Sequence, residues 1–226
     1  MAGGVLIVWT DIAPDLETDF NDWYNREHLP DRVGRMPGFL RGRRYAAVDG
    51  ALGAPRFLTY YDLTSTAVMQ SEAHVALRKN RRERDHFFLP RFQNTIKAIC
   101  DVACRVGEAD GELLALLPVR ADAGREDAFA HHLARTLLPA LAVERGVVSA
   151  LYARANVDIT RASSAKDDRA GDRYADGLIA VQIANEAGAA AALRALRRDA
   201  LARAGGAPQF IEQPCVLRLM FELRAA

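Results

Sequence analysis

The segment Phe20–Pro30 (FNDWYNREHLP) carries the clearest candidate for chemistry, a histidine followed closely by a proline. At about 100° per residue, one stripe of the helix predicted here contains Leu16, Phe20, Trp23, Tyr24, Glu27 and His28. That stripe should face a sheet, where burial would keep His28 neutral and able to exchange a proton near pH 7, with Glu27 raising its basicity. Pro30 cannot donate a hydrogen bond to the carbonyl of Arg26, so the helix should open beside His28 and leave room for a ligand. The alternative is a core histidine bonded to a backbone carbonyl.

Two consecutive tyrosines, Tyr60 and Tyr61, lie in a predicted strand and must therefore point to opposite faces of a sheet. One of them should reach the helix side near His28, where its phenol could steady the oxyanion that develops on a carbonyl substrate. Trp23 and Tyr24 would form the apolar walls of such a pocket. An ordinary role as core tyrosines is the alternative.

Cationic side chains supply a second set of candidate ligand contacts. Arg43 and Tyr45 share one strand face with Arg41, and could hold an anionic substrate or only border the sheet. His74 follows Ser71, a predicted helix N-cap, and is either a substrate contact or a surface histidine. A basic cluster in the same region contains Arg78, Lys79, Arg81, Arg82 and Arg84. We interpret the cluster as a solvated helix face, with an anion-attracting rim as the alternative.

The patterns that would indicate a metal, a disulfide or a phosphate loop are missing. Cys100 and Cys104 are too far apart along a strand to pair, and three cysteines cannot all pair. His131 and His132 point to different sides of a helix, so they form no metal-binding face. We expect no metal, no organic cofactor and a reduced, cytoplasmic protein.

The elements that must position these residues are predicted in the order β-α-β-β-α-β, which occurs twice. In residues 1–108 the strands are 4–10, 39–48, 56–63 and 95–106, the helices are 15–34 and 65–89, and a turn spans 49–55. In residues 109–226 the strands are 113–119, 147–155, 178–184 and 216–223, and the helices are 124–144 and 186–203. Leu138-Pro139 matches Leu29-Pro30 in register. The extra segment Asn156–Asp176 is polar and is predicted to be a mobile loop.

This order is that of a ferredoxin-like unit, in which a four-stranded antiparallel sheet carries both helices on one face. Each sheet leaves its other face bare. We therefore predict an α+β fold of two tandem ferredoxin-like units that pack sheet to sheet as an intramolecular pseudo-dimer.

Composition locates the candidate site in one half. The chain has 226 residues, 50% of them hydrophobic, and a net charge of +1, which argues against a nucleic-acid-binding protein. Its N-terminal apolar run, Val5–Trp9, is too short to cross a membrane. Of 17 Phe, Trp and Tyr residues, 12 lie in residues 1–108. Since rings often line ligand pockets, we place the site in that half and regard residues 109–226 as a degenerate partner. A merely larger core is the alternative.

The pattern F-x-x-W-Y-x-x-E-H-L-P, followed by Pro37-Gly38-Phe39, resembles the dimeric α+β barrel superfamily and within it EthD-type proteins. Residues 59–63 (TYYDL) and the segment from Ser71 to Leu77 resemble the third strand and second helix of that family. The resemblance covers about residues 4–106, since Leu137 stands in the second half where His28 stands in the first. Relatives include cofactor-free monooxygenases of aromatic polyketides, lactone isomerases, polyketide cyclases and haem-dependent enzymes, so the resemblance implies a fold more firmly than a reaction.

Together these observations predict a small-molecule enzyme that uses His28 for proton transfer on an apolar, aromatic or polyketide-like carbonyl substrate. Monooxygenase, isomerase and cyclase reactions all remain open. The second hypothesis is a non-catalytic binder or accessory protein that uses the same pocket, and the third is a purely structural protein. The expected partner is a small apolar or aromatic ligand rather than nucleic acid or a membrane, and further self-association of the fused pair is left open.

Overall fold

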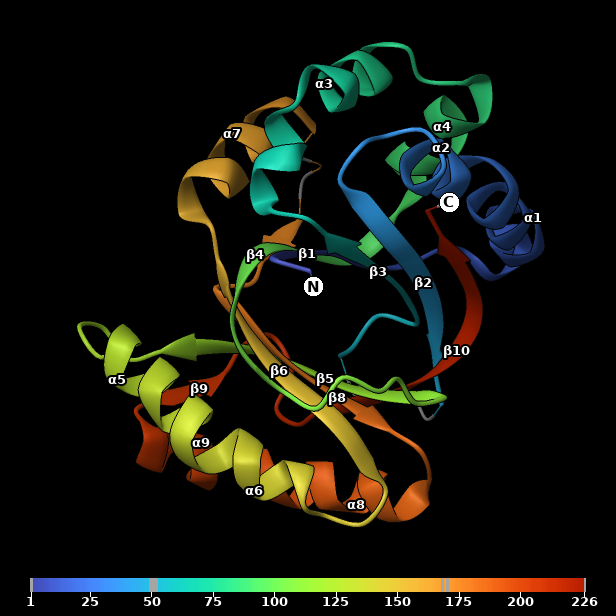
Figure 1. Ribbon diagram of the computed structural model, residues 1–226. Helices are drawn as coiled ribbons and strands as arrows, with labels where there is room; N and C mark the ends of the chain where they lie inside the picture. Colours follow the sequence, from blue (N-terminus) through green and yellow to red (C-terminus); the bar gives the residue numbers. More distant parts are fainter. Residues whose placement is uncertain (1, 49–52, 168, 170, 226) are drawn as a thin grey trace.

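The computed structural model describes residues 2–48, 53–167, 169 and 171–225 (Figure 1). Part of the predicted turn at 49–55, residues 49–52, lies outside the described residues. Within the described chain, no helix is both long and apolar enough to cross a membrane.

The centre of the molecule is a closed barrel of antiparallel strands. Its strands are β1 (Gly4–Asp11), β2 (Phe39–Ala47), β3 (Phe57–Leu63), β4 (Gln93–Val106), β5 (Leu113–Ala121), β6 (Val147–Ala155), β8 (Gly177–Ile183) and β10 (Cys215–Arg224). The order around the barrel is β1-β3-β2-β10-β5-β8-β6-β4, and β4 pairs with β1 to close it. Two short strands are added outside this circuit, β7 (Arg173–Tyr174) parallel to β4 and β9 (Gly206–Pro208) antiparallel to β5. The fold is therefore mixed α+β, built on a closed antiparallel barrel.

Each half of the chain contributes four neighbouring strands to this barrel. The first half contributes the order β4-β1-β3-β2, and the second half the order β10-β5-β8-β6. The two sets join along two seams, β2 with β10 and β4 with β6. Because each seam is a backbone ladder, none of these eight strands is left with an open edge.

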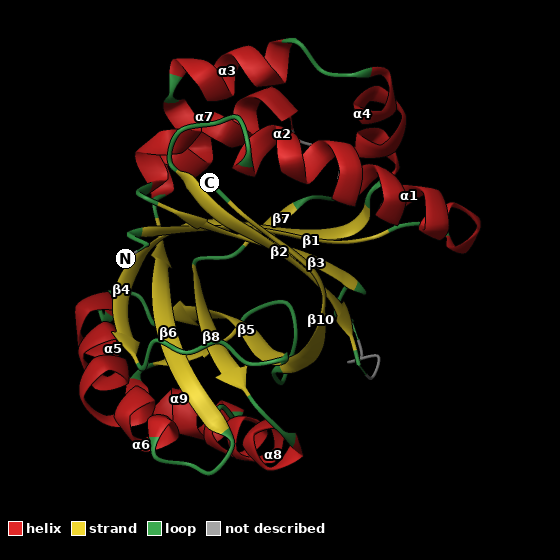
Figure 2. Ribbon diagram, turned by 45° about the vertical axis from the view of Figure 1, so that its right-hand side comes forward, coloured by secondary structure: helices red, strands yellow, loops and turns green. Residues whose placement is uncertain are grey.

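Helices cover the outer faces of the barrel on opposite sides (Figure 2). The first-half layer contains α1 (Glu17–Trp23), a π-helical turn (Tyr24–His28), α2 (Leu29–Val33), α3 (Glu72–Lys79) and α4 (Glu83–Phe88). The second-half layer contains α5 (Glu126–His132), a π-helical turn (Leu133–Leu137), α6 (Leu138–Ala142), α8 (Glu186–Ala195) and α9 (Arg198–Ala204).

The predicted opening of the first helix takes the form of the π turn. The N–H of Leu29 bonds to the carbonyl of Tyr24, and Pro30 follows with no N–H of its own. The second half has the same turn directly before Leu138-Pro139. The prediction of one helix over 65–89 was wrong, because this stretch is divided into the 3₁₀ segment Thr66–Gln70, α3, α4 and the 3₁₀ segment Leu89–Arg91.

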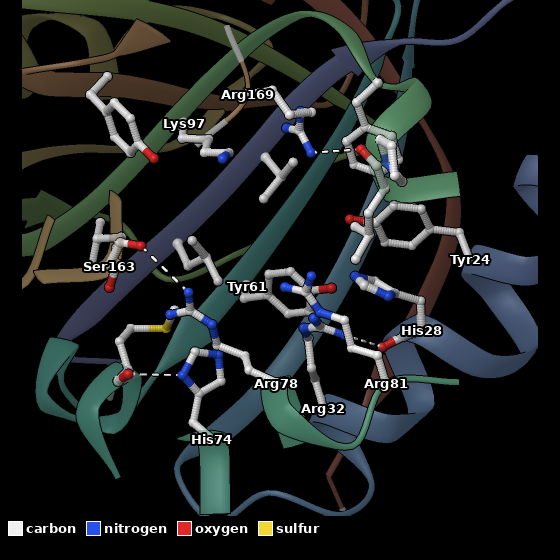
Figure 3. Close-up of a pocket in the computed structure, with 18 residues that line it drawn as sticks. Tyr24, His28, Arg32, Tyr61, His74, Arg78, Arg81, Lys97, Ser163 and Arg169 are labelled. Carbon is white, nitrogen blue, oxygen red and sulfur yellow. Dashed lines mark hydrogen bonds between the residues drawn. The ribbon is translucent and has the colours of Figure 1, made fainter. Parts of the chain in front are cut away.

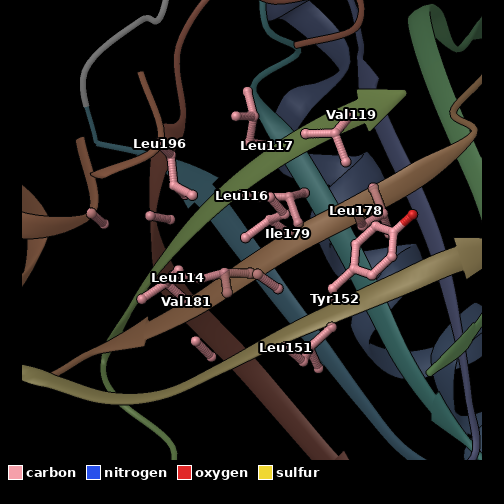
Figure 4. Close-up of a cluster of buried hydrophobic side chains, with 14 of the residues drawn as sticks. Leu114, Leu116, Leu117, Val119, Leu151, Tyr152, Leu178, Ile179, Val181 and Leu196 are labelled. Carbon is pink, nitrogen blue, oxygen red and sulfur yellow. The ribbon is translucent and has the colours of Figure 1, made fainter. Parts of the chain in front are cut away.

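Alternation along the strands separates two cores. On β1, Val5, Ile7 and Trp9 face the barrel interior, whereas Leu6 faces the first-half helices. Strand β5 is buried on both faces, and Figure 4 shows several of its leucines packed with residues of β6 and β8. The barrel interior is thus a packed core, and a site for a ligand has to lie outside it, under the helices.

The segment Asn156–Asp176 corrects another prediction, since much of its described part forms α7 (Val157–Asp167) and β7 rather than a loop. Although it belongs to the second half, α7 lies beside α3 over the first half (Figure 1). Ile159 packs into the first-half outer core, and the Asn156 amide donates to the Asp101 carboxylate at 2.9 Å. These contacts are with residues distant in sequence, which is why local polarity alone suggested a loop.

We predict that Gly42→Leu lowers the free energy of unfolding by about 1–3 kcal/mol, the usual cost of overpacking. Helix α2 lies so close to β2 that a Cβ at Gly42 would come within 2.9–3.0 Å of side-chain atoms of Val33 and Leu29. Urea unfolding is the measurement. Leu40→Val, at a half-exposed position of the same strand, is the control and should change stability by less than about 0.5 kcal/mol. An unchanged stability for Gly42→Leu would contradict this account of how α2 docks.

Candidate functional site

A cavity of about 340 Å³ lies between the outer face of the first-half sheet and its cover of helices (Figure 3). Leu6 on β1 forms part of its floor and is the cross-strand partner of both Tyr61 and Ile99, which also line it. Ser163 of α7 and Tyr174 of β7 close the cavity from the second half of the chain. Its size is in the usual range for small-molecule sites.

Three residues spaced four apart, Tyr24, His28 and Arg32, reach the cavity from one helical face. The π turn carries Tyr24 and His28, whose ring centroids are 4.7 Å apart, and α2 carries Arg32. The guanidinium of Arg32 donates to the backbone carbonyl of His28 at 2.9 Å. The opening beside Pro30 therefore coincides with the part of the helix that lines the cavity.

His28 is buried and is held by a carboxylate from α4. Its Nδ1 lies 2.9 Å from Oδ1 of Asp85, which also accepts from the indole N–H of Trp23 at 3.2 Å. The other oxygen of Asp85 accepts from the backbone N–H of Arg82 at 3.1 Å. Among the described residues, Nε2 of His28 has no hydrogen-bond partner, and it belongs to a ring that lines the cavity.

The charges of this pair follow from their surroundings. Burial, assisted by the positive charge of Arg32, lowers the pKa of His28 to about 3 against the opposing effect of Asp85. Burial alone would raise the pKa of Asp85, but its hydrogen bonds with His28 and Arg82 lower that pKa to about 2. At neutral pH an ionised Asp85 therefore accepts the Nδ1–H of a neutral His28, which leaves the Nε2 lone pair on the cavity side.

Glu27 does not occupy the position that the sequence suggested. Its carboxylate accepts from the guanidinium of Arg84 at 2.6 Å, and it is not among the residues that line the cavity. Neighbouring helical residues point about 100° apart, so Glu27 cannot face the same side as His28. Asp85 makes the contact with the imidazole instead.

The two tyrosines separate as adjacent strand residues must. Tyr61 lines the cavity, whereas Tyr60 lies in the barrel interior beneath the guanidinium of Arg43, 4.7 Å from its ring centre. The Tyr61 hydroxyl is buried and makes no hydrogen bond to the described chain. Burial, together with the neighbouring Tyr24 phenol, raises the pKa of Tyr61 well above its ordinary value, so its hydroxyl keeps its proton.

The structure does not bring Arg41, Arg43 and Tyr45 to the cavity. Arg43 pairs with Asp62 at 2.9 Å and with Asp110 at 3.0 Å, and Arg41 pairs with Asp110 at 2.6 Å. Tyr45 belongs to the packed barrel core. Their strand face looks into the barrel, so these arginines join the first half to the start of the second rather than contact a ligand in the cavity.

Trp23 and His74 flank the site in different ways. Trp23 is fully buried behind His28, with ring centroids 4.5 Å apart, and supports the cavity without lining it. His74 lines the cavity, and its Nδ1 lies 2.8 Å from the carbonyl of Met69. The predicted N-cap is confirmed, since the Ser71 hydroxyl accepts from the backbone N–H of His74.

The basic cluster is not a uniformly solvated helix face. Arg78 and Arg81 line the cavity, whereas Arg82 pairs with Asp31 and Arg84 with a carboxylate of the first helix. The preferred interpretation of this cluster does not hold for Arg78, which is half-buried on the cavity side of α3, or for Arg81, which is half-buried in the break between α3 and α4.

Sequence reasoning missed four residues that shape the site. Arg32 had a usable signal, its four-residue spacing from Tyr24 and His28. Asp85, Lys97 and Arg169 had none, since each meets its neighbours through contacts between distant segments. Among the described residues, no group of three or more His, Cys, Asp or Glu side chains is placed to hold a metal ion.

The closed barrel, with helices on its outer faces and a helix-covered cavity, is the dimeric α+β barrel fold. Solved structures with a similar fold include an anthrone oxidase-like protein, with a TM-score of 0.64 and 14% identity over 99% of this chain and 95% of that one. Two proteins named "putative monooxygenase" are also similar. That from Fusobacterium nucleatum has a TM-score of 0.55 and 12% identity, over 99% of this chain and 95% of that one. That from Lactobacillus acidophilus has a TM-score of 0.56 and 9% identity, over 99% of this chain and 97% of that one. At such identities the similarity establishes the fold alone. The sequence matches no protein-family model and no curated protein.

We predict that His28 makes the protein lose stability as the pH falls below about 6.5. An unfolded histidine takes up a proton near pH 6.5, but the folded pKa is about 3, so the unfolded state binds more protons between these values. The stabilisation is therefore complete above pH 6.5 and is lost toward pH 3, by about 2 kcal/mol from pH 6.5 to pH 5. Urea unfolding at pH 7, 6 and 5 should show this loss in the wild type and a smaller one in His28→Gln.

The exposed His131 provides the control, because His131→Gln should keep the pH dependence of the wild type. Parallel pH profiles for the wild type and His28→Gln would contradict a buried, neutral His28.

Proposed function

We propose that the protein is a small-molecule enzyme in which His28 transfers a proton to or from an apolar, aromatic or polyketide-like carbonyl substrate bound in the first-half cavity. The observation that carries this proposal is the arrangement of His28, whose Nδ1 is held by Asp85 while Nε2 is left without a protein partner on the cavity side. A carboxylate that orients an imidazole and stabilises its protonated form is a recurring feature of general bases.

The chemistry starts with Nε2 of His28 accepting a proton from a carbon that the substrate carbonyl acidifies, either next to that carbonyl or joined to it through conjugated carbons. The electron pair of the broken C–H bond moves to the carbonyl oxygen and forms an enolate, while Asp85 stabilises the imidazolium. The hydroxyls of Tyr24 and Tyr61 can donate to the developing oxyanion, since both side chains line the cavity and the Tyr61 hydroxyl has no hydrogen-bond partner in the described chain. Return of the proton at another position would complete an isomerisation.

The basicity of His28 depends on the ligand. Burial and the charge of Arg32 lower the pKa of His28 to about 3, too low for an efficient base by itself. A developing oxyanion beside Arg32 would offset that positive charge and raise the basicity of the imidazole. His28 would then accept a proton most readily when negative charge is forming on the substrate.

We also propose that the chain is a fused pseudo-dimer of two ferredoxin-like units, residues 1–108 and 109–226. Two observations support this interpretation: the strand orders of the two halves match, and each half has a π turn that is directly followed by a Leu-Pro pair. Leu137 occupies in the second π turn the place that His28 occupies in the first. Only the first unit would then carry the proposed base, in keeping with the resemblance of residues 4–106 to EthD-type proteins.

The name of one structural neighbour, an anthrone oxidase-like protein, suggests anthrone as a first probe. Anthrone has an acidic CH₂ group whose anion is conjugated with the carbonyl through the fused aromatic rings, so proton abstraction can be followed without assuming an oxidation. We expect the protein to accelerate deuterium incorporation at that carbon in D₂O, measured by NMR under nitrogen.

His28→Ala should lower the enzymatic exchange rate at least about 100-fold, the usual contribution of a general base. Asp85→Asn should lower it less, because it keeps the ring but removes its orienting carboxylate. His131→Ala, at an exposed helical position, is the matched control and should exchange at the wild-type rate. Undiminished exchange in His28→Ala would remove His28 from the reaction. Native mass spectrometry that finds bound, unchanged anthrone with no accelerated exchange would favour the non-catalytic binder.

A further inference from the structure

The charged side chains that line the cavity all have one sign. Five of the described lining residues are charged at neutral pH, and all are cations: Arg32, Arg78, Arg81, Lys97 and Arg169. No described lining residue is an aspartate or a glutamate. In Figure 3, Arg32, Arg78 and Arg81 lie together on one side of the cavity, with Lys97 and Arg169 on the other.

Arg32 differs from Lys97 and Arg169 in how its charge is compensated. Lys97 lies 2.5 Å from the carboxylate of Asp172, and Arg169 contacts the same carboxylate at 3.1 Å. Arg169 also donates to the carbonyl of Leu89 at 2.8 Å. Arg32 makes only its hydrogen bond to the His28 carbonyl and has no ion pair with any residue in the described part of the chain. Of these three cations, Arg32 is therefore the one best placed to take a counterion from a ligand.

A further cation, Arg44, is fully buried and packs against a residue that lines the cavity. The guanidinium of Arg44 lies 4.4 Å from the ring centre of Tyr24, which lines the cavity. Its Nη1 donates to the side chain of Asn25 at 3.0 Å, but Nε and Nη2 have no partner in the described chain. Burial lowers the pKa of Arg44 to about 10, as expected for a charge removed from water with no carboxylate beside it.

The positive potential reaches the proposed base. After burial, the charges of Arg32 and, to a smaller extent, Arg81 are among the causes that lower the pKa of His28. A cluster of cations at a partly apolar site, with a buried guanidinium behind it, favours a ligand that brings negative charge. The planar fork of Arg32 suits the two oxygens of a carboxylate.

The rest of the lining describes the other part of the ligand. Leu6, Val8 and Ile99 form an aliphatic floor, and the rings of Tyr61 and Phe92 also face the space. These surfaces suit a flat ring system, whereas the cations lie on two sides of the cavity.

We infer that the cavity selects an organic anion, an aromatic compound bearing a carboxylate, and that Arg32 is the residue that binds the charged group. This inference rests on the proposed function in one respect: both place the ligand in the same cavity. It adds a specificity-determining residue and narrows the proposed aromatic carbonyl substrate to one that also bears a carboxylate.

The test compares two ligands of nearly equal shape, 2-naphthoate and 2-naphthamide, by isothermal titration calorimetry at pH 7.5 and low salt. We expect the wild type to bind 2-naphthoate at least about 10-fold more tightly than 2-naphthamide, because a charge-assisted pair is stronger than a neutral one. Arg32→Gln should remove this preference while changing 2-naphthamide binding by less than about 3-fold. Arg32→Lys should keep part of the preference.

The matched control is Arg26→Gln, since Arg26 lies on the same helical segment, pairs with Asp22 and is largely exposed. This variant should keep the wild-type preference. Equal binding of acid and amide by the wild type, no detectable binding of 2-naphthoate at millimolar concentration, or an undiminished preference in a folded Arg32→Gln would each overturn the inference. The wild-type comparison decides the ligand class even if Arg32→Gln does not fold.

His28→Ala distinguishes this inference from the proposed reaction. It should bind 2-naphthoate nearly as well as the wild type while losing proton exchange with anthrone. If the wild type prefers 2-naphthoate but does not accelerate exchange, only the proposed reaction is contradicted. If it accelerates exchange but binds the acid and the amide equally, only the inference of an anionic ligand is contradicted.

Discussion

The two seams of the barrel, β2 with β10 and β4 with β6, are the constraint on which the rest of the structure depends. Their backbone hydrogen bonds join the edges of two four-stranded sheets, so the inner faces are buried together in one core. Described side chains fill that interior, and the ligand-sized cavity lies outside it, where helices cover the outer face of the sheet. The first-half helices leave a cavity above the sheet.

A local break in the helix gives this cavity its chemical character. The π turn Tyr24–His28 and the following Pro30 interrupt the regular i→i−4 hydrogen bonds of the helix where the aromatic stripe meets the sheet. Asp85 then holds the imidazole from α4, with Trp23 packed behind it. The second half has the same turn, with Leu137 at the position of His28. The π turn therefore occurs in both halves, but the imidazole occurs only in the first.

Electrostatics couples the ligand to the base in the site that we propose. An imidazole that is buried among cations resists protonation, whereas negative charge beside Arg32 would reduce that resistance. Binding of an anion and activation of His28 would then be two consequences of the same charge compensation. The segment α7–β7 contributes to this environment from the second half, through Arg169 and the Asp172 carboxylate near Lys97.

Periodicity and special residues in the sequence were sufficient to predict the eight barrel strands, the opening before Pro30 and the opposite orientation of Tyr60 and Tyr61, since these depend on neighbours a few residues away. They also indicated which half holds the cavity. The partner of His28, by contrast, is 57 residues distant, and the cover over the cavity comes from a polar segment that forms a helix against the first half. Local patterns determine which face of an element is apolar and where it breaks. Which charged groups meet across that face was decided only by the tertiary structure, because closure of the barrel brings remote segments together.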